Sequence, residues 1–256
     1  MKYTLDTDFS SLNGPKAANW VLKFSDIVDV AFADSDASAR LLGNLLVLEP
    51  YIHTLRQGLA SRGRAIPIIM QEALDLLWGY LEGSKIPSYF EDFANNFFAS
   101  TLNYNTGEEI TDTQADFYRE HFDDVEQTTI EWQILTWQST LLMELLAATG
   151  GRLDFEEYEE YEYTIDFDGM DEMLNLLGDV CIELTDTPCA SNKAIDVMKA
   201  QEQVYQTPLF QEFVGHIQNA LKAALSALPE QYKELQAEYR QHTILPPEYA
   251  EAILNY

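Results

Sequence analysis

Residues 124–151 read DVEQTTIEWQILTWQSTLLMELLAATGG, and their apolar side chains recur at the spacing of a buried helix face. Gly150 and Gly151 follow this apolar pattern directly, and glycine commonly ends a helix because it adopts left-handed backbone conformations. The sequence therefore predicts a helix from about Asp124 to Thr149, and with it a helical core. The apolar positions of this helix are Ile130, Ile134, Leu135, Trp137, Leu141, Leu142, Leu145 and Leu146.

The rest of the chain carries the same helical period and little of the alternation that indicates strands. Pro15 opens a first predicted helix through Ala31, and Asp36 is the predicted N-cap of the next one. Pro50 is expected to kink or interrupt that second helix, because proline lacks the backbone donor. Further helices are predicted over residues 66–81, 87–102, 117–122, 170–180, 194–204, 208–225 and 229–239, with a short last one after Pro246.

These segments define the expected architecture. The chain has 256 residues, of which 46% are hydrophobic, so it can bury a sizeable core. It shows neither an internal repeat nor a Gly- or Ser-rich linker. We predict an all-α fold of roughly ten helices. Residues 1–256 form one domain in this prediction, or two tightly packed halves, 1–150 and 151–256.

Acidic residues crowd the middle of the chain. Residues 65–192 contain 28 Asp and Glu but only three basic residues, Lys85, Arg119 and Arg152, which gives a net charge of −25. The two flanking parts together contain 15 acids and 12 bases. Such a field favours solubility or a cationic partner, and it disfavours DNA and RNA, whose phosphates are bound by Lys and Arg. We therefore expect a binding protein whose partner is a basic protein surface and not a nucleic acid.

The segment from Asp154 to Asp168, called here the acidic segment, holds eight acids, three tyrosines and two phenylalanines. Its second half alternates apolar and polar residues, as strands do, whereas Phe155, Tyr158 and Tyr161 recur every three residues, as in a helical turn. One interpretation is a docking surface in which carboxylates attract Lys and Arg and tyrosines supply contact area. The other is a solvated acidic loop whose aromatic residues pack into the protein's own core.

We expect the partner to contact the acidic segment and also a short acidic helix that precedes the long helix quoted above. Both combine carboxylates with aromatic side chains, and binding hot spots pair a buried aromatic anchor with complementary charge. The predicted contact residues are Asp116, Glu120, Asp123, Asp124, Glu157, Tyr158, Glu159, Glu160 and Tyr161.

Patterns of catalytic and metal sites are sparse. The four histidines are widely separated and form no metal-spaced pair. Cys181 and Cys189 make neither a disulfide framework nor a metal-binding set, so free thiols are expected. We predict no catalytic residue, no metal and no cofactor.

The sequence also bears on location. Residues Met1 to Asp6 lack the basic start and the apolar run of a signal peptide. No uninterrupted apolar run approaches the roughly 18 residues of a membrane span. We expect a cytoplasmic protein that binds no membrane.

One acidic pattern keeps an enzymatic alternative open. Glu156-x-x-Glu159 followed by Glu183-x-x-Asp186 resembles the E-x-x-E…E-x-x-D pattern of the all-α nucleotide pyrophosphatases, which bind magnesium through those carboxylates. That family needs both pairs on well-formed, facing helices, and Asp186 lies two residues before Pro188. A magnesium-dependent nucleotide pyrophosphatase is therefore one alternative function.

Four short patterns lie within about residues 17–98: Trp20-x-x-x-Phe24, Ala39-Arg40-Leu41-Leu42, Leu77-Trp78-x-x-Leu81-Glu82-Gly83 and Phe90-Glu91-x-Phe93-Ala94. In these patterns the chain resembles the helical immunity proteins of bacterial polymorphic toxin systems. The resemblance implies a cytoplasmic antitoxin that binds and blocks one cognate toxin domain. Many such toxins are nucleases with basic substrate channels, which an acidic inhibitor complements in charge. A second alternative is a DNA mimic, which would inhibit nucleic-acid-binding proteins broadly rather than one partner.

Overall fold

The computed structural model describes residues 2–106, 111–122, 129–154, 164–191, 193–246 and 249–255. Over these residues the chain forms eleven α-helices and no strand, which confirms the predicted all-α fold. The helices are α1 (Pro15–Val21), α2 (Phe24–Ala31), α3 (Ala37–Ser61), α4 (Ile68–Leu81), α5 (Phe90–Thr106), α6 (Asp112–His121), α7 (Thr129–Ala148), α8 (Asp168–Leu184), α9 (Ala194–Val204), α10 (Pro208–Ser226) and α11 (Tyr232–Tyr239). Short 3-10 helices are η1 (Phe9–Ser11), η3 (Pro229–Gln231) and η5 (Ala252–Asn255).

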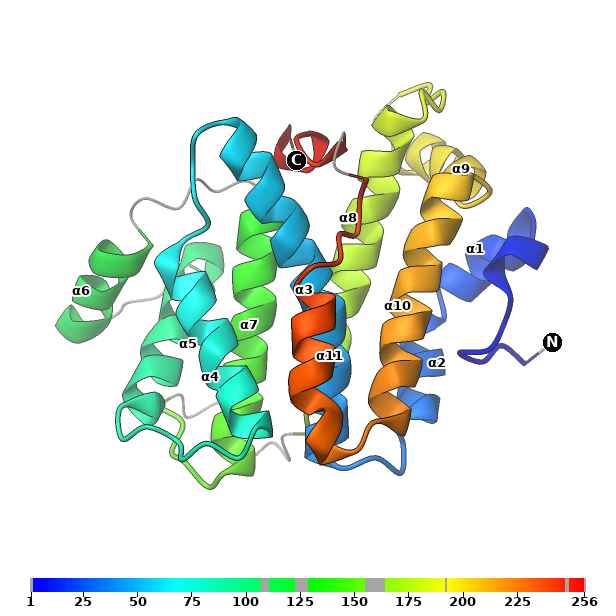
Figure 1. Cartoon of the computed structure of the whole chain (residues 1–256). Helices are drawn as coiled ribbons and strands as arrows, with labels where there is room; N and C mark the ends of the chain where they lie inside the picture. Colours follow the sequence, from blue (N-terminus) through cyan, green and yellow to red (C-terminus); the bar gives the residue numbers. More distant parts are fainter. Residues whose placement is uncertain are drawn as a thin grey trace.

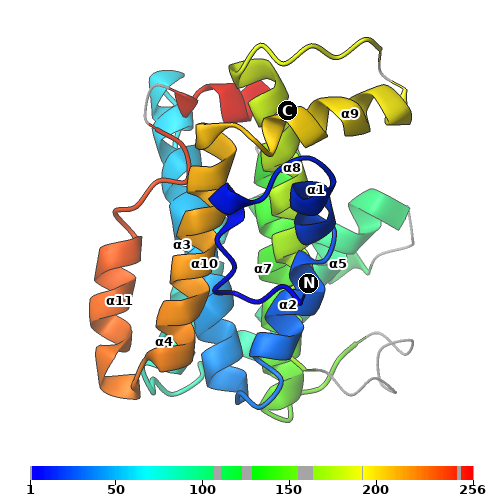
Figure 2. The ribbon, with the colours of Figure 1, turned by 90° about the vertical axis from the view of Figure 1, so that its right-hand side faces the viewer.

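Two long helices, α3 and α7, form the centre of the molecule. Helix α3 packs against α10, α7, α4 and α11, while α7 packs against α5, α4 and α8. These helices run roughly side by side, with α6 at one edge and α1 and α2 toward the other (Figure 1). Helix α9 lies crosswise over one end of the bundle (Figure 2). Helix α6 is therefore a peripheral element that projects from the bundle.

Helix α3 is buried on nearly all sides, and this burial explains its continuity. Every residue from Leu41 to Ile52 is buried, and the side chain of Asp36 caps the helix by accepting a hydrogen bond from the backbone N–H of Ala39 at 2.9 Å. The expected interruption at Pro50 is wrong, because α3 continues through that residue. A proline costs one backbone donor, and packing against the surrounding helices outweighs that loss.

The N-terminal region also differs from its prediction. Instead of a single helix from Pro15, the chain forms α1 and α2, separated by Leu22 and Lys23. The turn leaves Leu22 exposed, whereas Trp20 and Phe24 are both buried, with their ring centroids 4.9 Å apart. The two short helices thus each place one large aromatic ring in the core.

The buried apolar side chains of the described residues form one cluster that includes members of both predicted halves. Helix α7, from the first half, packs directly against α8, from the second. The division of the chain into one domain or two packed halves stays a prediction.

The acidic segment is described only at its ends. Residues 155–163 lie outside the described residues, so the prediction of a strand, helix or loop there stays open. Residues 164–167 form neither strand nor helix, and α8 begins at Asp168. Ile165 and Phe167 are buried, and the Phe167 ring packs 4.7 Å from that of Phe32. This end of the acidic segment therefore follows the interpretation in which its apolar residues join the protein's own core.

Candidate functional site

Helix α6 is held in place by a capping box at its start. The side chain of Thr111 accepts a hydrogen bond from the backbone N–H of Gln114 at 3.3 Å, and the Gln114 side chain accepts one from the backbone N–H of Thr111 at 2.9 Å. This reciprocal pair satisfies two of the free donors at a helix N-terminus. The local sequence thus fixes where the helix begins.

Aromatic contacts then attach α6 to the bundle. The Phe117 ring lies 5.9 Å from that of Phe93, and the Phe122 ring lies 5.4 Å from that of Phe97, both in edge-to-face geometry with α5. Phe122 also lies 6.3 Å from Trp132 of α7. Such pairs add to the energy of apolar burial and favour one orientation of the rings. The aromatic face of α6 is therefore turned inward and its acidic face outward.

Two of the predicted contact residues lie on that outward face. Asp116 has a side chain that is 72% exposed and forms an ion pair with Arg119, one turn further along α6. Glu120 is 76% exposed, and its Oε2 lies 4.0 Å from Nε2 of His121. Asp112 is exposed too, so the three carboxylates follow one another at four-residue spacing along one side of the helix.

The other predicted contact residues lie outside the described residues, and their involvement stays a prediction. These are Asp123, Asp124, Glu157, Tyr158, Glu159, Glu160 and Tyr161.

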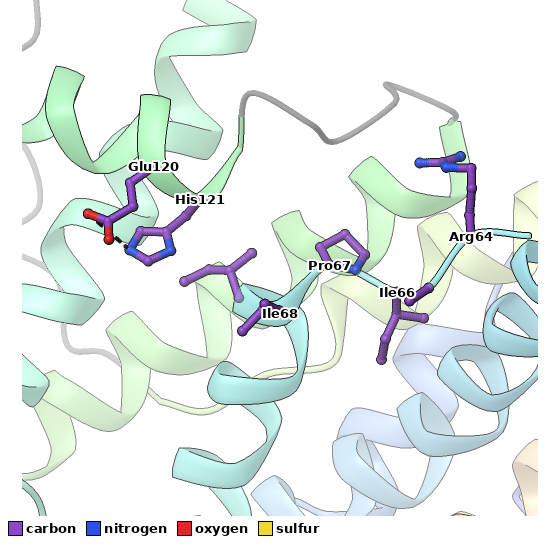
Figure 3. Close-up of a pocket in the computed structure, with 8 residues that line it drawn as sticks. Arg64, Ile66, Pro67, Ile68, Glu120 and His121 are labelled. Carbon is purple, nitrogen blue, oxygen red and sulfur yellow. Dashed lines mark ion pairs between the residues drawn. The ribbon is translucent and has the colours of Figure 1, made fainter.

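A groove of about 500 Å³ separates the end of α6 from the start of α4, and we call it the α6 groove. Figure 3 shows Glu120 and His121 at one end, Arg64 at the other, and Ile66, Pro67 and Ile68 between them. The residues that line it are Arg64, Ala65, Ile66, Pro67, Ile68, Ile69, Glu120 and His121.

The apolar floor of the α6 groove follows from the register of α4. Ile69, Met70 and Ala73 point into the core, so Ile68, at the first position of the helix, turns outward and is 77% exposed. Burial of such a side chain by a partner is favourable, because apolar surface leaves water. The sequence contained a signal for this feature, since Ile68 does not fit the helical period of the buried residues.

Arg64 lies at the far end of the α6 groove and forms an ion pair with Glu131. Its Nη2 lies 3.5 Å from Oε1 of Glu131, whose side chain is completely buried. The backbone N–H of Arg64 donates to the carbonyl of Leu59 at 2.9 Å, which fixes the turn after α3. Because a buried carboxylate faces the guanidinium, this cation is offset by a charge inside the protein. No sequence pattern had marked Arg64 as a residue of the site.

A buried polar cluster anchors the described end of the acidic segment. Asn44 accepts a hydrogen bond from Nε1 of Trp137 at 2.9 Å and donates one to the carbonyl of Asp166 at 2.8 Å. The backbone N–H of Asp166 donates to Oε1 of Glu144 at 3.4 Å. Burial, reinforced by the nearby Asp166 carboxylate, raises the pKa of Glu144 to about 9. Glu144 is thus protonated at neutral pH and belongs to the core.

Only the second pair of the pyrophosphatase pattern, Glu183 and Asp186, lies in the part of the chain that the structure describes. Glu183 lies near the end of α8, which stops at Leu184, and Asp186 lies beyond the helix with a positive φ of 50°. The second carboxylate pair therefore does not share one helix face. Glu156 and Glu159 lie outside the described residues. Within the described ranges, no three His, Cys, Asp or Glu side chains are grouped so that they could hold a metal ion.

The two cysteines are free thiols, as predicted. Burial raises the pKa of Cys181 to about 12, so this thiol stays protonated and inert. Cys189 is exposed, and its Sγ lies 3.2 Å from the carbonyl oxygen of Ser191. Neither thiol lies in the α6 groove.

Comparisons of the chain with protein-family models, curated proteins and solved structures found no significant match. Among the helices that the structure describes, none is long and apolar enough to cross a membrane. The function proposed below therefore rests on the sequence and on the geometry of the α6 groove and its acidic edge.

Proposed function

We propose that this chain is an acidic immunity protein that binds one cognate bacterial toxin domain, such as a basic nuclease, and blocks it in the cytoplasm. The observation that carries the proposal is the distribution of charge, a net of −25 over residues 65–192. A field of one sign accelerates encounter with a partner of opposite sign and disfavours other partners. A nuclease has to display cations where it holds phosphates, so it is a fitting partner.

The placement of α6 supports this proposal. The helix stands at an edge of the bundle (Figure 1). Its residues Asp112, Asp116 and Glu120 are exposed. Its aromatic face is fixed against α5 and α7, so the carboxylates are presented by a rigid element rather than by a mobile tail. Preorganised contact groups lose less conformational entropy when a partner binds.

The patterns behind the family resemblance lie in the helical core. Trp20, Phe24, Leu77, Trp78 and Phe90 are all buried, and each belongs to a helix. The resemblance is to a family defined by its overall helical pattern rather than by catalytic residues. The resemblance consequently supports the class of protein without assigning contact residues.

Co-expression with the toxin domain encoded beside this gene tests the proposal. We expect that domain alone to stop the growth of a bacterial host and the chain to restore growth through a stable complex. Charge reversal by Glu120→Lys should weaken rescue, whereas Glu234→Lys, at an exposed position of α11, is the matched control and should not. Absence of rescue by the wild-type chain would overturn the proposal.

The same assay separates the alternatives. A DNA mimic would also inhibit unrelated basic nucleases, whereas an immunity protein should act on its cognate domain alone. Nucleotide hydrolysis by the pure protein with magnesium, abolished by Glu183→Gln, would instead support the pyrophosphatase.

Two tyrosines of the acidic segment provide a further test of the contact surface. Tyr158→Ala and Tyr161→Ala should each weaken toxin binding by about 2 kcal/mol, the typical cost of truncating an aromatic anchor. The melting temperature should stay unchanged in both variants. Lower melting temperatures with unchanged affinity would assign these tyrosines to the fold.

A further inference from the structure

The α6 groove combines an apolar floor with one exposed carboxylate, that of Glu120, at its α6 end, and this combination specifies a ligand. Ile68 is 77% exposed and lies beside Ile66 and Pro67 (Figure 3). Their apolar surface leaves water when an aliphatic side chain of a partner covers it, which favours binding. The floor of the groove therefore fits an aliphatic side chain.

The two ends of the groove differ in charge. Glu120 is 76% exposed at the α6 end, beside His121, whose Nε2 lies 4.0 Å from its Oε2, whereas the Asp116 carboxylate one turn before it is paired with Arg119. At the opposite end, the guanidinium of Arg64 faces the buried carboxylate of Glu131 at 3.5 Å. Because the cation is offset and the exposed carboxylate is not enclosed, the rim attracts positive charge at the Glu120 end.

The charge of the whole chain decides between two kinds of occupant. A second copy would bring another net charge of −28 toward the acidic edge of α6 and would be repelled. A partner segment that carries Lys or Arg next to an aliphatic residue matches both features of the α6 groove. Charge complementarity therefore favours a cationic partner over self-association.

We propose that the α6 groove binds a partner segment in which an aliphatic side chain covers Ile68 and an adjacent Lys or Arg pairs with Glu120. This inference rests on the proposed function, because it names the part of the toxin domain that the groove receives. The aliphatic residue supplies buried contact area, and the basic residue fixes the direction of the segment along the groove. The Lys or Arg lies toward α6, and the chain of the partner continues toward the α3–α4 turn.

The decisive experiment uses a defined probe and the full chain. The peptide GSKLKSG is titrated into protein labelled at its isoleucine methyl groups, and the methyl resonances are followed by NMR. We expect saturable shifts at Ile66 and Ile68 and none at Ile195, an exposed isoleucine on α9. Replacing the peptide's leucine by serine should weaken binding at least tenfold, and replacing its lysines by glutamate should abolish it.

Two variants of the chain complete the test. Ile68→Ser should weaken peptide binding at least tenfold with an unchanged melting temperature, since the side chain is exposed. Ile195→Ser, the matched control, should bind as the wild type does. Absence of shifts at Ile66 and Ile68, or equal affinity for the leucine and serine peptides, would overturn the inference. A dimer that sedimentation detects in the wild type and not in Ile68→Ser would also overturn it, in favour of a second copy.

The outcome stays separable from that of the proposed function. If the wild-type chain rescues growth and Ile68→Ser rescues equally well, the toxin is bound elsewhere and only the groove inference fails. If the peptide binds as expected but the chain never rescues growth, the groove binds basic aliphatic segments and the immunity function fails.

Discussion

Replacing Glu144 by glutamine should remove the loss of stability that this buried acid causes as pH rises. The side chain is only 4% exposed, its Oε1 accepts the backbone N–H of Asp166, and its Oε2 has no hydrogen-bond partner among the described residues. Burial raises the pKa of this carboxyl from the usual 4.5 to about 9. The folded protein therefore holds a proton that the unfolded chain releases above pH 4.5.

The sign and size of the effect follow from this difference in pKa. Because the folded pKa is the higher one, the contribution of Glu144 is fully present below pH 4.5 and is lost as pH rises toward 9. Each pH unit in that window removes about 1.4 kcal/mol from the free energy of unfolding. Between pH 5 and pH 8 the loss is about 4 kcal/mol. Glutamine has the shape of the protonated acid and does not titrate, so Glu144→Gln should avoid the loss.

Urea unfolding at pH 5, 6, 7 and 8 measures this difference. At pH 5 the Glu144→Gln variant and the wild type should agree within about 1 kcal/mol, and at pH 8 the variant should be more stable by about 4 kcal/mol. Glu72→Gln is the matched control, because Glu72 is an exposed carboxylate on α4. Its stability difference from the wild type should not vary with pH. A difference for Glu144→Gln that is flat from pH 5 to pH 8 would refute the assignment of a neutral, buried acid.

Three further predictions address packing, ion pairing and encounter. Gly58→Ala should lower the free energy of unfolding although alanine favours helices, because the added methyl group would overlap the carbonyl oxygen of Ala250. In Gly215→Ala the added methyl group meets nothing within 4 Å, so this variant should raise the free energy of unfolding by about 0.5–1 kcal/mol in the same urea titration. Arg240→Ala should lower the free energy of unfolding by about 2–4 kcal/mol in that assay, since Nε of Arg240 lies 2.8 Å from Oε1 of the buried Glu49. An equal loss in an Arg240→Lys variant would indicate that the planar guanidinium matters and not only its charge. Association with the toxin domain, measured by stopped flow, should slow as salt rises from 0.1 M to 1 M, because the Debye length falls from about 10 Å to about 3 Å. Association rates that do not change with salt would contradict electrostatic steering.

The all-α fold could be predicted because helical periodicity is a local property of the sequence. The cap at Asp36 and the apolar face of α7 depend on neighbours three or four residues apart, which the sequence displays directly. The continuity of α3 through Pro50 could not be predicted in this way. It depends on helices that arrive from distant parts of the chain and bury α3 on nearly all sides.

The polar cluster around Asn44 also could not be predicted, because its side chains come from distant parts of the chain. Its partners Trp137 and Asp166 lie far away in the sequence, and only the packing of α7 against α3, and of α8 against α7, brings the three together. Composition suggested that every acid of the central region contributes to the surface charge. Glu144 does not, because burial and the nearby Asp166 carboxylate raise its pKa more than one backbone hydrogen bond and Arg40 lower it, so the carboxyl holds a proton.

The acidic residues of α6 could be predicted from the sequence, whereas the α6 groove could not, because the groove also depends on packing between distant parts of the chain. Asp116 and Glu120 stand out as charges in a region that has few cations, whatever the fold. The groove depends on where the aromatic face of α6 attaches to α5, and on Ile68 turning away from the core. The helical period of α4 already sets Ile68 apart from the buried residues, but the groove beside it forms only once α6 packs against α5.

The correction that the buried acids make to the surface charge is small, and this leaves the electrostatic reasoning intact. A protonated Glu144 removes one unit from the formal −25 of residues 65–192, and Glu131 is offset by Arg64 from outside that region. Changes of one or two units in a field of this size do not alter its sign or its attraction for a basic partner. The net charge of the whole region thus determines electrostatic steering, whereas single residues determine the specific contacts with the partner. Glu120→Lys and Ile68→Ser should for that reason both leave association nearly unchanged and mainly speed dissociation.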